Sequence, residues 1–305
     1  MASKKMEQSG PIKRFLGQII AKVKQSIFSA LLSKIPIAPM KRFFSLLVVF
    51  YFAVVMPLQA AEKRLPLKGE VFLILEHTAF LILPKQPQAG KPIPWVWYAP
   101  TLRGLPSNSE KWMFERFLKA GIAIAGVDVG ESYGSPKGRA VYTALHEHLV
   151  KKRGLAKEAC LLARSRGGLM LYCWAAENPD KVRCITGIYP VCNIASYPGL
   201  KRACGAYGLT VKELESQLTK HNPIDRLELL AKAKVPIFHI HGDKDSSVPL
   251  EKNSALIKER YDKLGGPMTL EVVKGQGHNM WAGWFQSQNL VDFVIKHATK
   301  SNLKK

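Results

Sequence analysis

Two kinds of hydrophobic segment alternate along the chain from about residue 70 onward. Short apolar runs with the length of buried strands occur at residues 122–129 and 159–164. Segments with helical spacing of apolar residues follow such runs, for example at residues 167–177. This alternation is typical of a mostly parallel sheet with helices on both of its faces. The pattern therefore predicts an α/β fold.

The same pattern gives the order of the expected elements. We expect strands at 71–83 (one or two), 94–98, 122–129, 159–164, 182–189, 236–241 and 268–273. We expect helices at 108–120, 139–152, 167–177, 250–264 and 285–297. Residues 193–234 have helical patterns but no clear strand, which predicts a small helical cap inserted between two strands of the sheet.

The N-terminal segment has a different pattern. A basic start at Met40 precedes an apolar run of 14 residues at 43–56, and small residues lead to Ala61. These features are typical of a secretory signal peptide, whereas a membrane-spanning helix needs about 20 apolar residues. We therefore predict a signal peptide at 40–61, with export to the periplasm or the outside of a bacterial cell. The catalytic domain is then 62–305, and an uncleaved membrane anchor is the alternative.

Charge adds a constraint on partners. The chain has 45 Lys and Arg residues against 23 Asp and Glu, a formal net charge of +22, which favours anionic partners. Residues 1–39 form either a basic amphipathic helix or an extension upstream of a true start at Met40. Because no basic stretch is interleaved with aromatic residues, we expect no nucleic-acid binding. Contact with a membrane is expected only through the signal or the N-terminal segment.

The segment around Ser165 carries the strongest indication of chemistry. A predicted strand leads into Ala163-Arg164-Ser165-Arg166-Gly167, and a predicted helix begins directly afterwards. A serine between small residues in such a tight turn is exposed as a nucleophile, and the backbone N–H of Arg166 points at the developing oxyanion. The pattern therefore predicts a nucleophile elbow.

An acid and a histidine follow in the order that this chemistry needs. Asp243 and Asp245 come after the next-to-last predicted strand, and His278 comes after the last. The carboxyl ends of parallel strands lie at the same edge of a sheet, so these side chains are expected near Ser165. His278 can then take the proton of Ser165, and a carboxylate can orient the imidazole.

Three segments together resemble the signature blocks of the α/β-hydrolase superfamily: Ala-Arg-Ser-Arg-Gly-Gly, His-Gly-Asp-Lys-Asp-Ser-Ser-Val-Pro and Gly-Gln-Gly-His. The similarity extends over residues 70–298. Within the superfamily, the chain is most similar to secreted bacterial esterases and to prolyl-oligopeptidase-like serine hydrolases, a group that includes carbohydrate esterases. The resemblance implies an α/β-hydrolase fold and makes Asp245, rather than Asp243, the third member of the triad.

Other site residues are less clearly marked. No His-Gly-Gly-Gly segment follows residues 94–98, so we expect the backbone N–H of Tyr98 or Ala99 to be the second oxyanion donor, with the Tyr98 hydroxyl as an alternative. Four residues on the same rim are candidates for substrate binding: Arg164, Asp128, Glu131 and Trp281. For the arginines beside the nucleophile, pairing with structural carboxylates is the alternative.

The cysteines and the other histidines suggest structural roles. Cys192 and Cys204 flank a polar loop, and export would permit a disulfide between them. His239 and His241 lie on or beside a predicted buried strand, where we expect core residues. No Cys or His cluster has metal-ligand spacing, so we expect neither a metal nor a cofactor.

These residues together predict an exported serine hydrolase that cleaves carboxylic esters through an acyl-enzyme. By analogy with similar bacterial enzymes, an ester linked to a polysaccharide is a candidate substrate, and the positive charge would also suit an anionic ester. Two alternatives stay open, namely a prolyl-oligopeptidase-like serine peptidase and a non-catalytic binding protein on a hydrolase scaffold.

Overall fold

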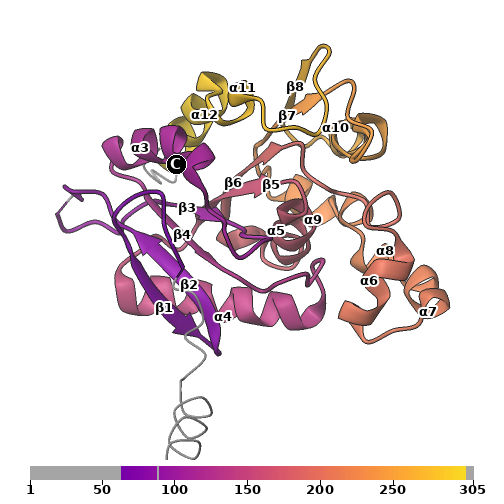
Figure 1. Ribbon diagram of the computed structural model, residues 1–305, viewed down its shortest axis with the longest axis horizontal. Coiled ribbons are helices and arrows are strands. Elements are labelled where there is room, and N and C mark those ends of the chain that lie inside the picture. Colours follow the sequence, from indigo (N-terminus) through magenta and orange to yellow (C-terminus); the bar gives the residue numbers. More distant parts are fainter. Residues whose placement is uncertain (1–62, 88, 300–305) are drawn as a thin grey trace, which may run out of the picture. The chain divides into compact units, whose positions relative to one another are not determined.

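A sheet of eight strands runs through the computed structural model, which describes residues 63–87 and 89–299 (Figure 1). The strands are β1 (Glu70–Ile74), β2 (His77–Ile82), β3 (Trp95–Tyr98), β4 (Ala123–Val127), β5 (Ala159–Arg164), β6 (Val182–Ile188), β7 (Ile237–Gly242) and β8 (Met268–Val273). Their order is β1-β2-β4-β3-β5-β6-β7-β8. β2 is antiparallel to β1 and β4, and every other neighbouring pair is parallel. This sheet confirms the predicted fold class.

The predictions for the N-terminus concern residues outside the described part of the chain. The predicted extension at 1–39 and the predicted signal peptide at 40–61 both lie outside the described residues. In the part that is described, no helix has the length and hydrophobicity needed to cross a membrane.

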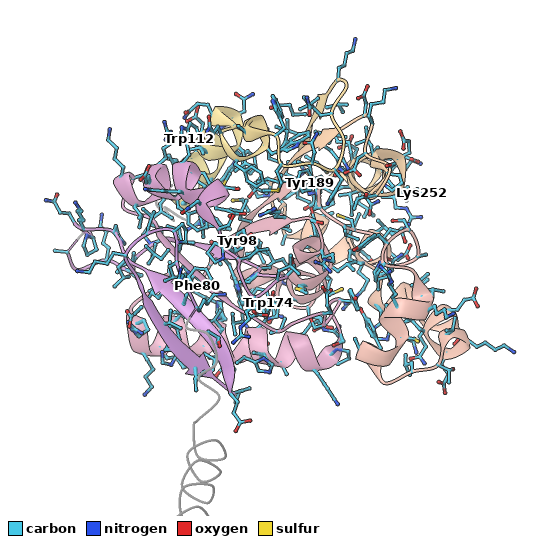
Figure 2. All side chains as sticks on the ribbon, in the orientation of Figure 1. Phe80, Tyr98, Trp112, Trp174, Tyr189 and Lys252 are labelled. Carbon is cyan, nitrogen blue, oxygen red and sulfur yellow. The ribbon has the colours of Figure 1, made fainter. Side chains whose placement is uncertain are left out.

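Helices cover both faces of the sheet. α3 (Lys111–Lys119) and α12 (Gln288–Ala298) pack on one face, and α4 (Pro136–Arg153), α5 (Gly167–Ala175), α9 (Glu228–Lys232) and α10 (Ser254–Lys263) pack on the other. Both faces are therefore buried, which explains why β4 and β5 are apolar at nearly every position. Trp174 of α5, labelled in Figure 2, packs against Trp97 of β3 with ring centroids 4.7 Å apart.

The insertion between β6 and β7 contains the expected helices. α6 (Leu200–Tyr207), α7 (Val211–Ser216) and α8 (Leu218–His221) lie to one side of the sheet (Figure 1). They pack around a separate apolar cluster of buried residues, Leu169, Val191, Ile194, Ala203, Leu214 and Val248. Leu230 and Ala231 of α9 instead belong to the core under the sheet. The helical cap thus ends before α9, although the sequence pattern extends it to residue 234.

Capping residues shift several helix ends from their predicted positions. The helix expected at 139–152 begins earlier, because Ser135 caps it and Pro136 fits the first helical position. The helix expected at 108–120 begins with a 3-10 turn capped by Ser107. The last one is divided into α11 (Ala282–Phe285) and α12, with Ser287 as the N-cap of α12. Four 3-10 turns complete the described elements: Asn108–Glu110, Pro179–Lys181, Pro223–Asp225 and Leu250–Lys252.

The expected disulfide between Cys192 and Cys204 is absent, and all five cysteines of the described residues are free. Cys192 is buried in the core under the sheet, with its thiol directed at the Pro190 carbonyl. Cys204 lies on α6 against the separate cluster of the cap, with its thiol directed at the Lys201 carbonyl. The two thiols belong to different clusters and face different carbonyls, so the prediction was wrong.

Candidate active site

The turn between β5 and α5 holds Ser165 in an unusual backbone conformation. Its φ is +47°, in the left-handed region that non-glycine residues rarely adopt. Its N–H donates to the Ile188 carbonyl at 3.1 Å, and its carbonyl accepts from the N–H groups of Gly168 and Val191 at 2.9 and 2.8 Å. Such strain persists only where neighbouring segments hold the residue in place, and here β6 and the loop after it do so.

Close packing explains the glycines that follow the serine. A Cβ on Gly167 would lie 3.1 Å from the Ala99 carbonyl oxygen. A Cβ on Gly168 would lie only 2.3 Å from the Val191 carbonyl oxygen, closer than real Cβ contacts come. The first turn of α5 is thus in contact with the backbone of the neighbouring loops, and only glycine leaves room for this approach.

Ser165, His278 and Asp245 form one chain of hydrogen bonds. Ser165 Oγ lies 2.9 Å from Nε2 of His278, and Nδ1 of His278 lies 2.7 Å from Oδ2 of Asp245. The three residues follow β5, β8 and β7, so they meet at the carboxyl edge of the parallel strands. Because a carboxylate only accepts, Nδ1 carries the proton of a neutral imidazole and Nε2 is free to accept the proton of the hydroxyl.

The geometry distinguishes the two candidate aspartates. Asp243 accepts a hydrogen bond from the Gly275 N–H at 2.7 Å and makes no contact with His278. Asp245 accepts at Oδ1 from the N–H groups of Ser247 and Val248, at 3.0 and 2.8 Å, and at Oδ2 from His278. The structure therefore brings Asp245, and not Asp243, to the imidazole.

Asp245 lies in an environment that keeps it ionised. Burial alone raises the pKa of this carboxyl group, but hydrogen bonds from His241, His278 and the Val248 N–H outweigh burial and lower the pKa well below its usual value. The carboxylate is therefore charged at neutral pH. It can hold the neutral imidazole in one tautomer and stabilise an imidazolium beside it.

Two backbone N–H groups beside Ser165 have no acceptor within residues 63–87 and 89–299: those of Arg166 and Ala99. Arg166 precedes α5, and Ala99 is buried directly after β3. An oxyanion in the site would supply an acceptor for both N–H groups. Tyr98 is the last residue of β3 and is paired with Leu162 of β5. Its hydroxyl donates to Oε1 of Glu110 at 2.9 Å and is thus already engaged.

Arg164 is engaged in the interior rather than in the open site. Its Nη1 lies 2.5 Å from Oε1 of Glu110, whose side chain is fully buried. The other carboxylate oxygen of Glu110 accepts from the N–H and the hydroxyl of Ser107. This outcome matches the structural alternative for Arg164 and not substrate binding. Arg166 pairs likewise with Glu131, but closer to the surface.

Residues 142–300, about half of the chain, match the prolyl oligopeptidase family. The chain belongs to this family. It is a serine hydrolase of the α/β-hydrolase superfamily. No curated protein sequence is significantly similar to it.

Solved structures with the same fold include peptidases and esterases. The dipeptidyl peptidase 4 of Porphyromonas gingivalis is 16% identical with a TM-score of 0.62, covering 75% of this chain and 35% of that one. The S-formylglutathione hydrolase of Agrobacterium tumefaciens is 15% identical with a TM-score of 0.60, covering 76% and 94%. A truncated carbohydrate esterase from gut microbiota is 16% identical with a TM-score of 0.56, covering 73% and 91%. The chain thus spans about a third of the peptidase.

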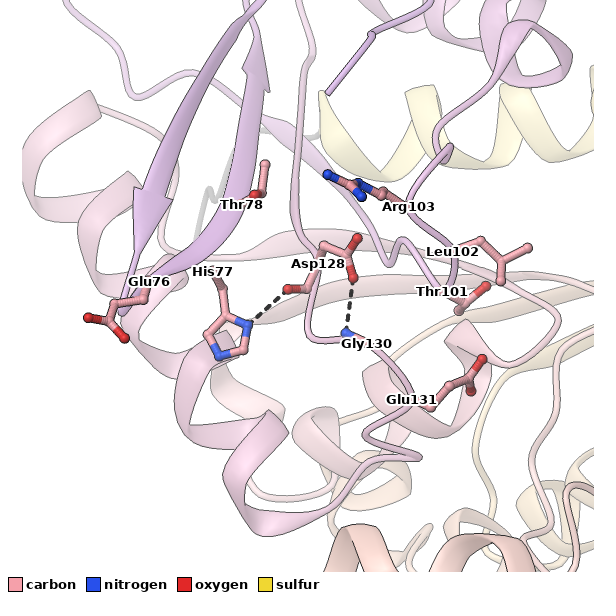
Figure 3. A pocket seen from close by; sticks show the side chains of 9 residues that line it. All are labelled: Glu76, His77, Thr78, Thr101, Leu102, Arg103, Asp128, Gly130 and Glu131. Atoms are coloured by element: carbon pink, nitrogen blue, oxygen red, sulfur yellow. Dashed lines mark hydrogen bonds between the residues drawn. The ribbon is translucent and has the colours of Figure 1, made fainter. Parts of the chain in front are cut away.

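In this member of the prolyl oligopeptidase family, a pocket of about 470 Å³ lies between the start of β2 and the loops after β3 and β4 (Figure 3). Its lining residues are Glu76, His77, Thr78, Thr101, Leu102, Arg103, Asp128, Gly130 and Glu131. Two of the predicted binding residues, Asp128 and Glu131, therefore share one pocket. Glu131 connects the pocket to the nucleophile through its ion pair with Arg166.

The polar groups of the pocket are mostly acceptors. Asp128 binds the Gly130 N–H with Oδ1 and has no ion pair within the described residues. Nδ1 of His77 donates to the Asp128 carbonyl at 3.1 Å, so Nε2 of the neutral ring is an acceptor (Figure 3). Thr101, which also lines the pocket, is a buried residue that carries a hydroxyl group.

Trp281 lies outside this pocket. It is 42% exposed and packs edge-on against Trp284, with ring centroids 5.2 Å apart. Met280, beside it, is 56% exposed. Trp284 in turn contacts Tyr189, whose ring centroid lies 4.3 Å from that of His278. An exposed apolar surface therefore borders the histidine on the side of the β8–α11 loop.

Some residues that surround the site were not predicted from the sequence. Glu110 and Tyr189 give no local signal of their positions, apart from the Ser107 to Glu110 capping box, which predicts a helix start only. His241 was expected in the core and is fully buried, but it also lies 3.3 Å from Oδ2 of Asp245. Among residues 63–87 and 89–299, no group of three His, Cys, Asp or Glu side chains is placed to hold a metal ion.

Proposed function

We propose that the chain is an exported hydrolase that cleaves carboxylic esters through an acyl-enzyme on Ser165. The observation that carries this proposal is the continuous hydrogen bonding from Ser165 Oγ through His278 to an ionised Asp245. A hydroxyl that donates to a neutral imidazole, itself fixed by a carboxylate, is an activated nucleophile.

Each step has a group in place. Ser165 Oγ attacks the ester carbonyl carbon while its proton passes to Nε2 of His278. The free N–H groups of Arg166 and Ala99 donate to the oxygen that becomes negative in the tetrahedral intermediate. His278 then returns the proton to the leaving alcohol, and water repeats the sequence to release the acid.

The pocket at the start of β2 supports an ester that carries hydroxyl groups. Asp128, Nε2 of His77 and Glu76 offer acceptors, and Thr101 and Arg103 offer donors. Hydroxyl groups both donate and accept, so a sugar unit fits this mixture better than an apolar acyl chain does. A polysaccharide ester is therefore the proposed substrate, and export through the segment at 40–61 would bring the enzyme to it.

A serine peptidase is the second candidate, because the family match and the dipeptidyl peptidase fold admit it. The similar region is 94% of the S-formylglutathione hydrolase and 91% of the truncated carbohydrate esterase, whereas it is 35% of the peptidase. A single hydrolase domain of this kind thus accounts for nearly all of the S-formylglutathione hydrolase, which favours ester substrates.

The test is a parallel assay of the wild type and Ser165→Ala on p-nitrophenyl acetate, an acetylated polysaccharide and aminoacyl p-nitroanilides. We expect release of p-nitrophenol and of acetate by the wild type and neither by the variant. Cleavage of the anilides with little ester hydrolysis would make the peptidase the better assignment. If the wild type cleaves none of these, the binding-protein alternative gains support.

A further inference from the structure

A buried row of hydrogen bonds leads away from the back of the triad carboxylate. Nε2 of His241 lies 3.3 Å from Oδ2 of Asp245, and neither side chain is exposed. Nδ1 of His241 lies 2.8 Å from Oγ of Ser254, and the same oxygen lies 2.9 Å from Nδ1 of His239. The row ends at Tyr172, whose hydroxyl lies 2.7 Å from Nε2 of His239.

The Val248 carbonyl fixes which nitrogen of His241 donates to it, and the other directions follow when both rings of the row are neutral. Nε2 of His241 also lies 2.8 Å from the Val248 carbonyl oxygen, which can only accept, so Nε2 carries the proton. In the neutral ring Nδ1 then accepts from the Ser254 hydroxyl, and the Ser254 oxygen accepts from Nδ1–H of His239. Burial lowers the pKa of His239 to about 3, so this ring is neutral and accepts from Tyr172.

The donors of this row follow one another towards Asp245, and the N–H of His241 is shared between the Val248 carbonyl at 2.8 Å and Oδ2 of Asp245 at 3.3 Å. Hydrogen bonds aligned in one direction polarise one another, so the N–H of His241 is a stronger donor than an isolated imidazole would be. Asp245 receives two N–H groups at Oδ1 and the two histidines, His278 and His241, at Oδ2. The carboxylate is thus held from both sides, and its rotation would break one of these contacts.

The row connects separate elements of the fold. Tyr172 lies on α5, the helix that begins at the nucleophile elbow, while both histidines lie on β7 and Ser254 begins α10. β6 makes room for it, since a Cβ on Gly187 would lie 2.6 Å from Cδ2 of His239. The position of the acid is therefore tied to the helix of the nucleophile through the interior.

We propose that His241, held by Ser254 and His239, is a positioning residue that orients Asp245 and keeps it ionised without touching the substrate. This inference rests on the proposed function, in which Asp245 serves His278. The N–H of His241 draws negative charge away from the edge of the carboxylate that faces His278. Its removal should leave that carboxylate a stronger acceptor for the N–H of His278.

Other titratable groups around the row do not change charge near neutral pH. Burial raises the pKa of Tyr189, which contacts His278, and that of Tyr172. Burial likewise raises the pKa of Cys192 and Tyr261, the two groups whose charges act on Tyr172. These four groups therefore add no change of charge to a rate profile between pH 5 and 8.

The experiment compares His241→Leu, His241→Gln and Ser254→Ala with the wild type in p-nitrophenyl acetate hydrolysis. For His241→Leu we expect kcat to fall about 10-fold to 100-fold, the range for losing one hydrogen bond to a charged group, with KM nearly unchanged. The acidic limb of kcat/KM should move to higher pH by about half a unit or more. His241→Gln keeps an N–H near the position of Nε2 and should recover most of the loss.

Ser254→Ala removes only a hydroxyl. It should move the acidic limb of kcat/KM to higher pH, by less than His241→Leu does. If thermal unfolding shows that His241→Leu does not fold, Ser254→Ala tests the inference in its place. The inference would be overturned if the variants fold, keep the wild-type kcat and show the wild-type acidic limb of kcat/KM. A change in KM alone would overturn it as well. A wild type that neither hydrolyses the ester nor reacts with a fluorophosphonate would instead contradict the proposed function.

Discussion

At the scale of single residues, the site depends on side chains whose polar atoms are fully used. Asp245 accepts from the Ser247 and Val248 N–H groups and from two histidines, and Glu110 accepts from Tyr98, Arg164 and Ser107. A buried charge with this many donors is held in one place. Glu110 thus holds Arg164 beside the nucleophile, and Asp245 holds the imidazole of His278.

The two aspartates of the loop after β7 provide a matched pair of variants. Asp245→Asn should lower kcat on the order of 10⁴-fold, because the amide no longer holds the imidazole in the required tautomer. Asp243→Asn removes an acceptor for the Gly275 N–H only and should leave kcat within about threefold of the wild type. Initial rates on p-nitrophenyl acetate measure both. The reverse ranking would assign the acid to Asp243.

Glu110 provides a test of stability. Glu110→Gln leaves the guanidinium of Arg164 buried without its charged partner, and we expect the free energy of unfolding to fall by about 3 kcal/mol. Glu115→Gln, which removes an exposed partner of Lys111, should change it by less than about 1 kcal/mol. Urea unfolding curves compare the two. Equal, small effects would mean that the buried pair does not stabilise the elbow.

At the scale of elements, the sequence predicted the strands better than the helix ends. β4 and β5 are covered on both faces, so their uninterrupted apolar runs identify them. Helix ends depend on single capping contacts such as that of Ser135, which the spacing of apolar residues does not report. Contacts across the fold are harder to predict than helix ends. Arg164 and Glu110, for example, are 54 residues apart, and nothing in the local sequence links them.

The elbow itself was predictable because its chemistry is local. Gly168→Ala tests the packing that it requires, since the new Cβ would lie 2.3 Å from a backbone oxygen. We expect a loss of about 1–3 kcal/mol in the free energy of unfolding, together with lower kcat as Ser165 moves. Gly205→Ala on α6, where nothing lies within 4 Å, should be neutral or slightly stabilising. Unchanged stability and kcat in Gly168→Ala would contradict this account.

At the scale of the whole molecule, the order of the strands brings distant segments to one edge of the sheet. Ser165, Asp245 and His278 were predictable as a set, because each follows a strand whose carboxyl end must lie at that edge. The role of the interior was not predictable in the same way. His241 has the sequence context of a core residue and is one, yet its ring also contacts the triad acid.

The buried histidines also predict how stability depends on pH. The folded-state pKa of His239 is about 3, below its ordinary value of 6.5, so between these pH values only the unfolded chain binds this proton. Stability should therefore fall as the pH falls from 6.5 towards 3, by about 1.4 kcal/mol per pH unit from this group. Urea unfolding from pH 7 to 5 should show a shallower slope of stability against pH for His239→Gln than for the wild type and for His148→Gln, a half-buried control on α4. If the free energy of unfolding falls with pH equally in all three proteins, His239 makes no contribution to the pH dependence of stability.

The most direct test of the central claim is labelling with a fluorophosphonate, followed by mass mapping of the modified peptide. The account predicts one adduct on Ser165 in the wild type, with no labelling of Ser165→Ala and much slower labelling of His278→Ala. Labelling of another residue, or equal labelling of the wild type and Ser165→Ala, would contradict the assignment of Ser165 as the nucleophile.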